Sequence, residues 1–182
     1  MPNGLEGRSL PRITFKMRVR DASVGGDNPF RWQDRTTEDL FKGKRVVAFG
    51  LPGAFTPTCT TEQCPAFERD YDKLKGHGID EVYCISVNDA FVMYQWGLKL
   101  ATKNIQFIPD GSGDFTRRLG MLVDKSHLGF GMRSWRYAMV VNDGVIEKWF
   151  EEPGINDHGD DDDPYSASAP DKVMAYLDAV KA

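Results

Sequence analysis

The chain has 182 residues, 41% of them hydrophobic, which fits a single domain (residues 1–182) with a full hydrophobic core. Its formal net charge of −4 gives no basic surface for nucleic acid or for an anionic membrane. No apolar run approaches the ~20 residues of a membrane helix, and the N-terminus lacks the apolar core of a secretory signal, so a soluble cytoplasmic protein is expected. Three cysteines, an odd number, favour reduced thiols over a disulfide framework.

The first forty residues carry weak signals. Residues 1–11 are rich in Gly, Pro and Ser and are expected to form a loose tail. Apolar residues at alternate positions from 13 to 19 predict a half-buried strand. Thr36 or Thr37 then provides an N-cap, followed by acidic residues, for a short helix that Gly43 ends.

The next stretch joins a buried strand to a cysteine. The apolar run over residues 45–50 predicts a strand buried on both faces, and Pro, Gly and Thr residues then stop regular structure until Thr58. A helical pattern begins at Cys59 and runs to Lys75, with Pro65 expected to kink it or to shift its register. A cysteine in the first helical turn faces unpaired N–H groups and the positive end of the macrodipole, so its thiolate is favoured.

The middle of the chain alternates strand and helix patterns. Residues 79–87 predict a second buried strand, and Asp89 can cap the helix that follows. Residues 106–109 are short and apolar. Asp114 is expected to cap a brief helix that Gly120 ends.

The last third of the chain contains a hairpin and a helix. Residues 137–141 and 145–150 flank the tripeptide Asn-Asp-Gly at 142–144, which is a strong hairpin signal. A final helix follows Pro170. Strands separated by helical patterns predict an α/β fold with a mixed sheet flanked by helices.

An acidic irregular stretch separates the hairpin from the last helix. His158 beside Asp160–Asp163 raises the question of a metal site, but one histidine among like charges is typical of a solvated loop. We therefore predict neither a metal ion nor a cofactor.

Pro52, Thr56 and Cys59 form the spacing P-x-x-x-T-x-x-C. The proline stiffens the loop, and the threonine can offer its hydroxyl to the sulfur. The simpler alternative is a strand-to-helix loop with a buried cysteine, because short motifs also arise without function.

Other segments share a resemblance with this loop. SVNDAFVM at 86–93, FIPDGSGDFTRRLGML at 107–122 and FGMRSWRYAMVVNDG at 130–144 resemble the type II, or type 5, peroxiredoxins. The resemblance covers about residues 12–150 and the final helix, and the chain resembles the peroxiredoxin part of peroxiredoxin–glutaredoxin hybrids. It implies a thioredoxin-like topology.

The resemblance also implies an activity and the residues that perform it. The peroxidatic cysteine falls on Cys59, Pro52 and Thr56 complete its loop, and the active-site arginine falls on Arg136, although by sequence alone Arg133 is an equal candidate. The thiolate would attack hydrogen peroxide or an organic hydroperoxide and form a cysteine sulfenic acid. A fixed guanidinium would stabilise both the thiolate and the charge on the leaving oxygen.

Three further residues are candidates for the substrate pocket. The backbone N–H groups of Thr58 and Cys59 are expected donors to the peroxide. Leu128 and Phe130 stand where family members have apolar residues around the pocket mouth, or they pack in the core.

Three sources of the resolving thiol stay open. An external thiol, from glutathione with glutaredoxin acting in trans or from thioredoxin, ranks first, because Ser166–Ala169 occupy the region where related proteins carry a partner cysteine. Cys64 ranks second, since its Cα would lie about 8–9 Å from that of Cys59 in an intact α-helix, beyond disulfide reach. Cys84 ranks third, because it sits in a predicted buried strand.

Two other functions compete with the peroxidase. A peroxide sensor or thiol relay would use the same Cys59 without efficient turnover. A thiol–disulfide oxidoreductase would need a C-x-x-C pair, which the chain lacks. The resemblance also implies a homodimer.

Overall fold

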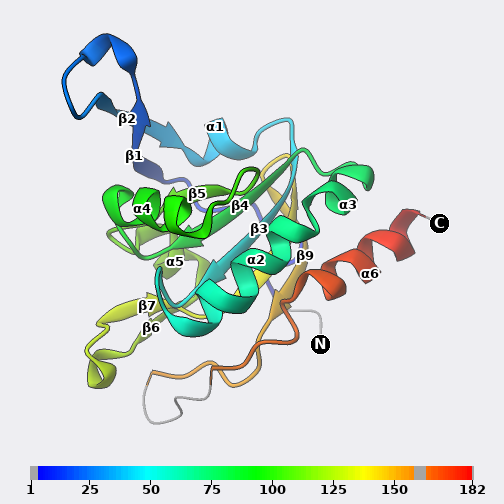
Figure 1. Cartoon of the computed structure of the whole chain (residues 1–182). Helices are drawn as coiled ribbons and strands as arrows, with labels where there is room; N and C mark the ends of the chain where they lie inside the picture. The colour runs from blue at the N-terminus through cyan, green and yellow to red at the C-terminus, as the bar shows by residue number, and fades with distance from the viewer. Residues whose placement is uncertain (1–3, 158–162, 182) are drawn as a thin grey trace.

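The computed structural model describes residues 4–157 and 163–181, which form a central sheet covered on both faces (Figure 1). The strands are β1 (Thr14–Arg20), β2 (Phe30–Thr36), β3 (Arg45–Leu51), β4 (Glu81–Ser86), β5 (Gln106–Pro109), β6 (Leu122–Asp124), β7 (Met132–Ser134), β8 (Tyr137–Asn142) and β9 (Val145–Glu151). The helices are η1 (Ala22–Val24), α1 (Thr37–Phe41), η2 (Cys59–Gln63), α2 (Cys64–Arg69), α3 (Tyr71–Gly76), α4 (Ala90–Leu100), α5 (Asp114–Leu119), η3 (Ser126–Leu128) and α6 (Pro170–Lys181).

Five strands make the central sheet, in the order β5-β4-β3-β8-β9. β3 pairs in parallel with β4, as β4 does with β5, whereas β8 runs antiparallel to both β3 and β9. Asp143 (φ 50°) and Gly144 (φ 79°) close the β8–β9 hairpin with the positive φ angles that such a turn requires. The mixed sheet and the hairpin are both confirmed.

The alternation of side chains along β3 divides the core in two. Val46 and Ala48 face a core that includes residues of α1 and α5. Val47 and Phe49 face the opposite core, which includes residues of α2, α3, α4 and α6. All three cysteines belong to this second core, so the fold gathers them on one face of the sheet.

The prediction of a loose tail over residues 1–11 is wrong for the residues that the structure describes. Leu10 is buried, and Ser9 forms a β-bridge with Val145. The Gly7 N–H donates to the Ile146 carbonyl at 2.8 Å. The start of β9, next to the turn of the β8–β9 hairpin, supplies these partners, which local composition does not reveal.

Two local predictions in the fold need correction. The side chain of Asp114 does not cap α5; instead, the Asp110 carboxylate accepts the N–H groups of Phe115 (3.1 Å) and Thr116 (2.8 Å). β2 was not predicted, because its sequence mixes charged and aromatic residues without a buried face. Within residues 4–157 and 163–181, no helix is long and apolar enough to cross a membrane.

Candidate active site

The loop after β3 delivers Cys59 to the first turn of a helical segment. This turn, η2, is a π-helix in which the Cys64 N–H donates to the Cys59 carbonyl five residues earlier. Pro65 follows at the start of α2 and supplies no backbone donor. The expected change of register near Pro65 therefore takes the form of a π turn, a feature that is frequent at functional sites.

A buried guanidinium lies against the sulfur. Arg136 Nη1 donates to Cys59 Sγ at 3.5 Å, and neither residue is more than 1% exposed. The same Nη1 also donates to the Gln63 carboxamide, and Nη2 donates to Asp163. Nε donates to the Pro164 carbonyl at 3.1 Å. These contacts on every side fix the cation beside the sulfur.

Arg133, the other candidate, has a different place. Its Nη1 donates to the Pro52 carbonyl at 3.2 Å, and its Nε donates to the Phe130 carbonyl at 3.0 Å. A Cβ atom on Gly53 would lie 2.2 Å from Arg133 Nη1, so the absence of a side chain there admits the guanidinium. Arg133 braces the loop, whereas Arg136 contacts the sulfur.

Burial and hydrogen bonding act on Cys59 in opposite directions. Burial raises the pKa of the Cys59 thiol, while Arg136, the Thr56 side chain and the Gly53 backbone lower it, and the net direction is upward. In this buried conformation desolvation outweighs the donors, and the thiolate expected at the helix start stays a prediction. Thr56 Oγ1 donates to the Gly53 carbonyl at 2.7 Å, which holds the loop closed beside the sulfur.

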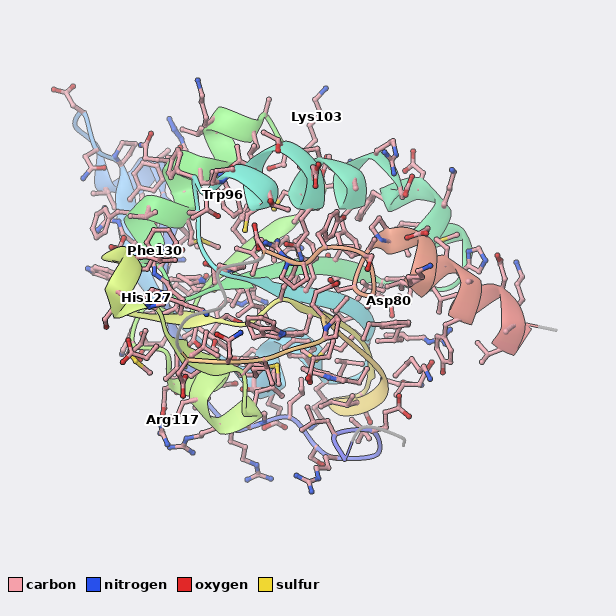
Figure 2. All side chains as sticks on the ribbon, turned by 90° about the horizontal axis from the view of Figure 1, so that it is seen from below. Asp80, Trp96, Lys103, Arg117, His127 and Phe130 are labelled. Atoms are coloured by element: carbon pink, nitrogen blue, oxygen red, sulfur yellow. The ribbon has the colours of Figure 1, made fainter. Side chains whose placement is uncertain are left out.

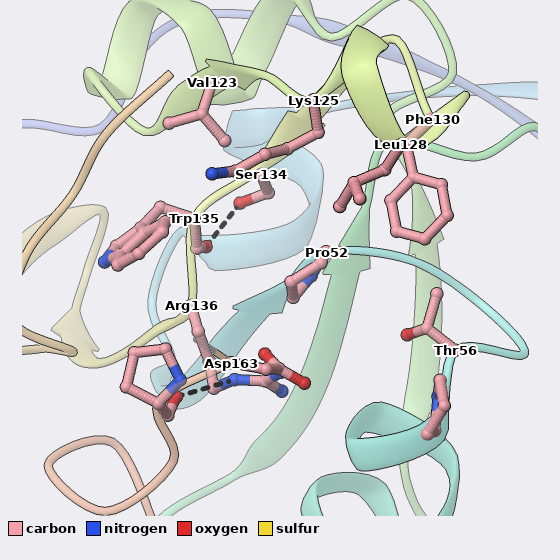
Figure 3. Close-up of a pocket in the computed structure, with 12 residues that line it drawn as sticks. Pro52, Thr56, Val123, Lys125, Leu128, Phe130, Ser134, Trp135, Arg136 and Asp163 are labelled. Carbon is pink, nitrogen blue, oxygen red and sulfur yellow. Dashed lines mark hydrogen bonds and ion pairs between the residues drawn. The ribbon is translucent and has the colours of Figure 1, made fainter. Parts of the chain in front are cut away.

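A pocket of about 210 Å³ opens next to this cluster (Figure 3). Pro52, Thr56 and Arg136 belong to its wall, as do the exposed side chains of Leu128 (45%) and Phe130 (38%). The exposure of these two side chains excludes their alternative role in the core. Figure 2 shows Phe130 at an outer end of the molecule.

Two candidate residues are absent from the lining of this pocket. Thr58 is half-buried and does not contribute to the wall, and Cys59 is fully buried behind Pro52, Thr56 and Arg136. A substrate in the pocket therefore reaches the sulfur only after a small local displacement of this wall.

Sequence analysis missed the residues that hold Arg136. Gln63 and Asp163 accept from its guanidinium, and Asp163 had been assigned only to a solvated acidic run. Glu152 is fully buried, and its carboxylate accepts the N–H groups of Ser166 (2.9 Å) and Ser168 (2.7 Å). Since Glu152 N–H also donates to the Arg136 carbonyl, it ties the chain after Asp163 to the arginine. Only the tertiary structure reveals these partners.

No metal centre emerges from the part of the chain that the structure describes. Among those residues, no three His, Cys, Asp or Glu side chains come together as ligands. His158 and Asp160–Asp162 lie outside the described residues.

The other two cysteines form a close pair. Cys64 Sγ and Cys84 Sγ are 3.8 Å apart, and both side chains are completely buried. All three thiols are free. Burial, followed by the neighbouring Cys64, raises the pKa of Cys84 well above its ordinary value.

Comparisons with known proteins agree with this arrangement. A family model described as Redoxin matches residues 31–167. The chain is 59% identical over 170 residues to Peroxiredoxin y4vD of Sinorhizobium fredii, covering 93% of this chain and 90% of that protein. It is 45% identical over 175 residues to the hybrid peroxiredoxin hyPrx5 of Haemophilus influenzae, covering 96% and 67%. The 1-Cys peroxiredoxin structure from Plasmodium falciparum matches with a TM-score of 0.88 and 35% identity, covering 96% and 99%.

Proposed function

Because the chain belongs to the peroxiredoxin family, in its type II or type 5 group, and is a thiol peroxidase that reduces peroxides, we propose that Cys59 is its peroxidatic cysteine. One observation carries the assignment: the Arg136 guanidinium donates to Cys59 Sγ at 3.5 Å. A buried cation beside a sulfur stabilises the thiolate, which is the nucleophilic form. Pro52 and Thr56 shape the loop that brings the peroxide to this pair.

The reaction needs charge stabilisation at two moments. The Cys59 thiolate attacks one peroxide oxygen, the O–O bond breaks, and the second oxygen leaves as water or an alcohol after it takes a proton. Arg136 stabilises the thiolate before attack and the negative charge on the departing oxygen afterwards. The Thr56 hydroxyl and the backbone N–H groups of Thr58 and Cys59 are further proposed donors.

The pocket supports organic hydroperoxides as substrates besides hydrogen peroxide. Its volume of about 210 Å³ exceeds the needs of a molecule close in size to water. Val123, Leu128, Phe130 and Trp135 give it largely apolar walls. An alkyl group would gain free energy by leaving water for this surface.

An external thiol supplies the electrons for turnover in this proposal. Glutathione with glutaredoxin, or thioredoxin, would return the oxidised enzyme to its thiol form. The likeness to a solved structure described as a 1-Cys peroxiredoxin supports an external reductant. Exposed apolar side chains beside the site, including Phe55 (52%), support a homodimer, and the free thiols support a cytoplasmic location.

Replacement of the sulfur tests the assignment. Cys59→Ser should abolish thiol-dependent peroxide consumption without changing the circular dichroism spectrum, because a serine hydroxyl is not appreciably ionised at neutral pH. Substantial residual turnover would contradict it. Multiple turnovers by the wild type with glutaredoxin or thioredoxin would separate a peroxidase from a sensor, which is oxidised once and passes the oxidation to a partner.

A further inference from the structure

Two of the three cysteines, neither of them Cys59, have their sulfurs in contact. Cys64 Sγ and Cys84 Sγ lie 3.8 Å apart, whereas a disulfide needs about 2.05 Å. Cys64 lies at the start of α2 and Cys84 lies in β4, so small side-chain rotations within one core can join them. Neither thiol has a role in the attack on peroxide.

The π turn brings Cys64 close to Cys59 as well. In an α-helix the residues joined by a backbone hydrogen bond are i and i+4, with an axial separation of about 6 Å. In η2 the bond joins i and i+5, which are Cys59 and Cys64. This bond gives the pair a spacing near the disulfide range of about 4.4–6.8 Å between Cα atoms, instead of the longer spacing in an α-helix.

We propose that Cys64 and Cys84 together resolve the oxidised enzyme, and that the oxidation formed at Cys59 passes through Cys64 into a buried Cys64–Cys84 disulfide. This proposal rests on the assignment of Cys59 as the peroxidatic cysteine. It differs from resolution by Cys64 or Cys84 alone, because Cys59 is released as a thiol at the end.

The transfer has two balanced steps after peroxide has made the Cys59 sulfenic acid. First, the Cys64 sulfur attacks the Cys59 sulfur, and the hydroxyl group leaves with the Cys64 proton as water. Second, the Cys84 sulfur attacks the Cys64 sulfur, and Cys59 leaves with the electron pair and accepts the proton from Cys84. In sum, one peroxide and two thiols give one disulfide, one water and one water or alcohol.

The surroundings of the sulfurs favour this direction of transfer. Arg136 stabilises negative charge on Cys59 as it leaves, whereas in the described part of the chain no cation is hydrogen-bonded to the Cys64–Cys84 pair. A sulfur that better accommodates negative charge leaves faster in thiol–disulfide exchange. The reverse exchange re-forms the disulfide between Cys59 and Cys64, and the external reductant then reduces it at Cys59, beside the pocket.

Peptide mapping can identify the end product directly. The reduced protein is mixed with one molar equivalent of hydrogen peroxide, alkylated with N-ethylmaleimide and digested with trypsin and an endoproteinase that cleaves after glutamate. Cleavage at Glu62 separates Cys59 from Cys64, which tryptic digestion alone leaves on one peptide, 46–69. Before alkylation, the intact protein should be two hydrogens lighter than its reduced form. The digest should then contain Cys64 linked to Cys84, with Cys59 alkylated.

Peroxide stoichiometry provides an independent measurement. Without a reductant, the wild type should consume two equivalents, one for the Cys64–Cys84 disulfide and one for a second sulfenic acid at Cys59. Cys64→Ala should consume one equivalent, with a sulfenic acid at Cys59. In Cys59→Ser, no Cys64–Cys84 link should form on the same timescale, because the transfer begins at Cys59.

Other outcomes overturn the proposal. A final Cys59–Cys64 or Cys59–Cys84 link in the wild type, or a sulfenic acid with both other thiols alkylated, would exclude the buried pair as the acceptor. Rapid oxidation of the pair in Cys59→Ser would exclude the transfer. If instead Cys59→Ser keeps full peroxidase turnover, the assignment of Cys59 itself fails. Mapping of the wild type decides the matter even if a variant does not fold.

Discussion

Replacement of Arg136 by methionine tests the electrostatic basis of the site. The guanidinium lies 3.5 Å from Cys59 Sγ, and both groups are buried. With charge centres about 4 Å apart and an effective dielectric constant of about 20, their attraction is about 4 kcal/mol. At about 1.36 kcal/mol per pKa unit, this attraction corresponds to about 3 units. Water that enters the space left by the shorter side chain would solvate the thiolate and replace part of this lost stabilisation.

Arg136→Met should therefore raise the pKa of Cys59 by a further 1–3 units, roughly, above its already raised value. Since only the thiolate reacts, the rate at neutral pH should fall about 10- to 1000-fold. Loss of charge stabilisation on the leaving oxygen would add to this decrease. The pKa is measured from the pH dependence of alkylation by iodoacetamide, and the rate by stopped-flow mixing with peroxide.

Arg133→Met is the matched control. Arg133 contacts the Pro52 and Phe130 carbonyls instead of the sulfur, so the alkylation midpoint of Cys59 should stay at the wild-type pH. Arg136→Lys keeps a charge, and should retain more of the wild-type rate than Arg136→Met. An unchanged midpoint and rate in Arg136→Met, or a larger shift in Arg133→Met, would refute the reasoning.

Local signals sufficed for much of the fold. The strong apolar runs at β3 and β4, the Asn-Asp-Gly turn before β9 and the cap at Asp89 each predicted the element that the structure contains. β2 was missed because it packs mainly along β1, in a hairpin that extends from the body of the molecule and needs no buried face (Figure 1). The cap at Asp110 was missed because that carboxylate reaches three residues further along the chain than a usual N-cap side chain does.

The site was predictable only as far as motifs extend. The spacing of Pro52, Thr56 and Cys59 located the loop, but it could not choose between Arg133 and Arg136. That choice depends on how β8 pairs with β3. Tyr137, the first residue of β8, pairs with Gly50, and Arg136 immediately precedes it and contacts the Cys59 sulfur. The 3.8 Å contact of Cys64 with Cys84 likewise arises when α2 packs on β4, since 20 residues separate the two along the chain.

Two predictions concern stability. A Cβ atom on Gly50 would lie 2.1 Å from Tyr137 Cε1 in the fully buried core, so Gly50→Ala should lower the free energy of unfolding by about 1–3 kcal/mol in urea titrations. Gly76→Ala, where nothing lies within 4 Å, is its control, and equal losses in both variants would contradict the packing argument. Hydrogen bonds to a backbone carbonyl and to Asp178 raise the pKa of His77 above its ordinary value of 6.5. The resulting stabilisation, below about 1 kcal/mol because Asp178 is 68% exposed, is complete below that value and is lost as the pH rises through the higher pKa of the folded state. Asp178→Asn should reduce the difference in urea midpoint between about pH 5.5 and about pH 8.5, and a difference as large as that of the wild type would show that another group titrates in this range.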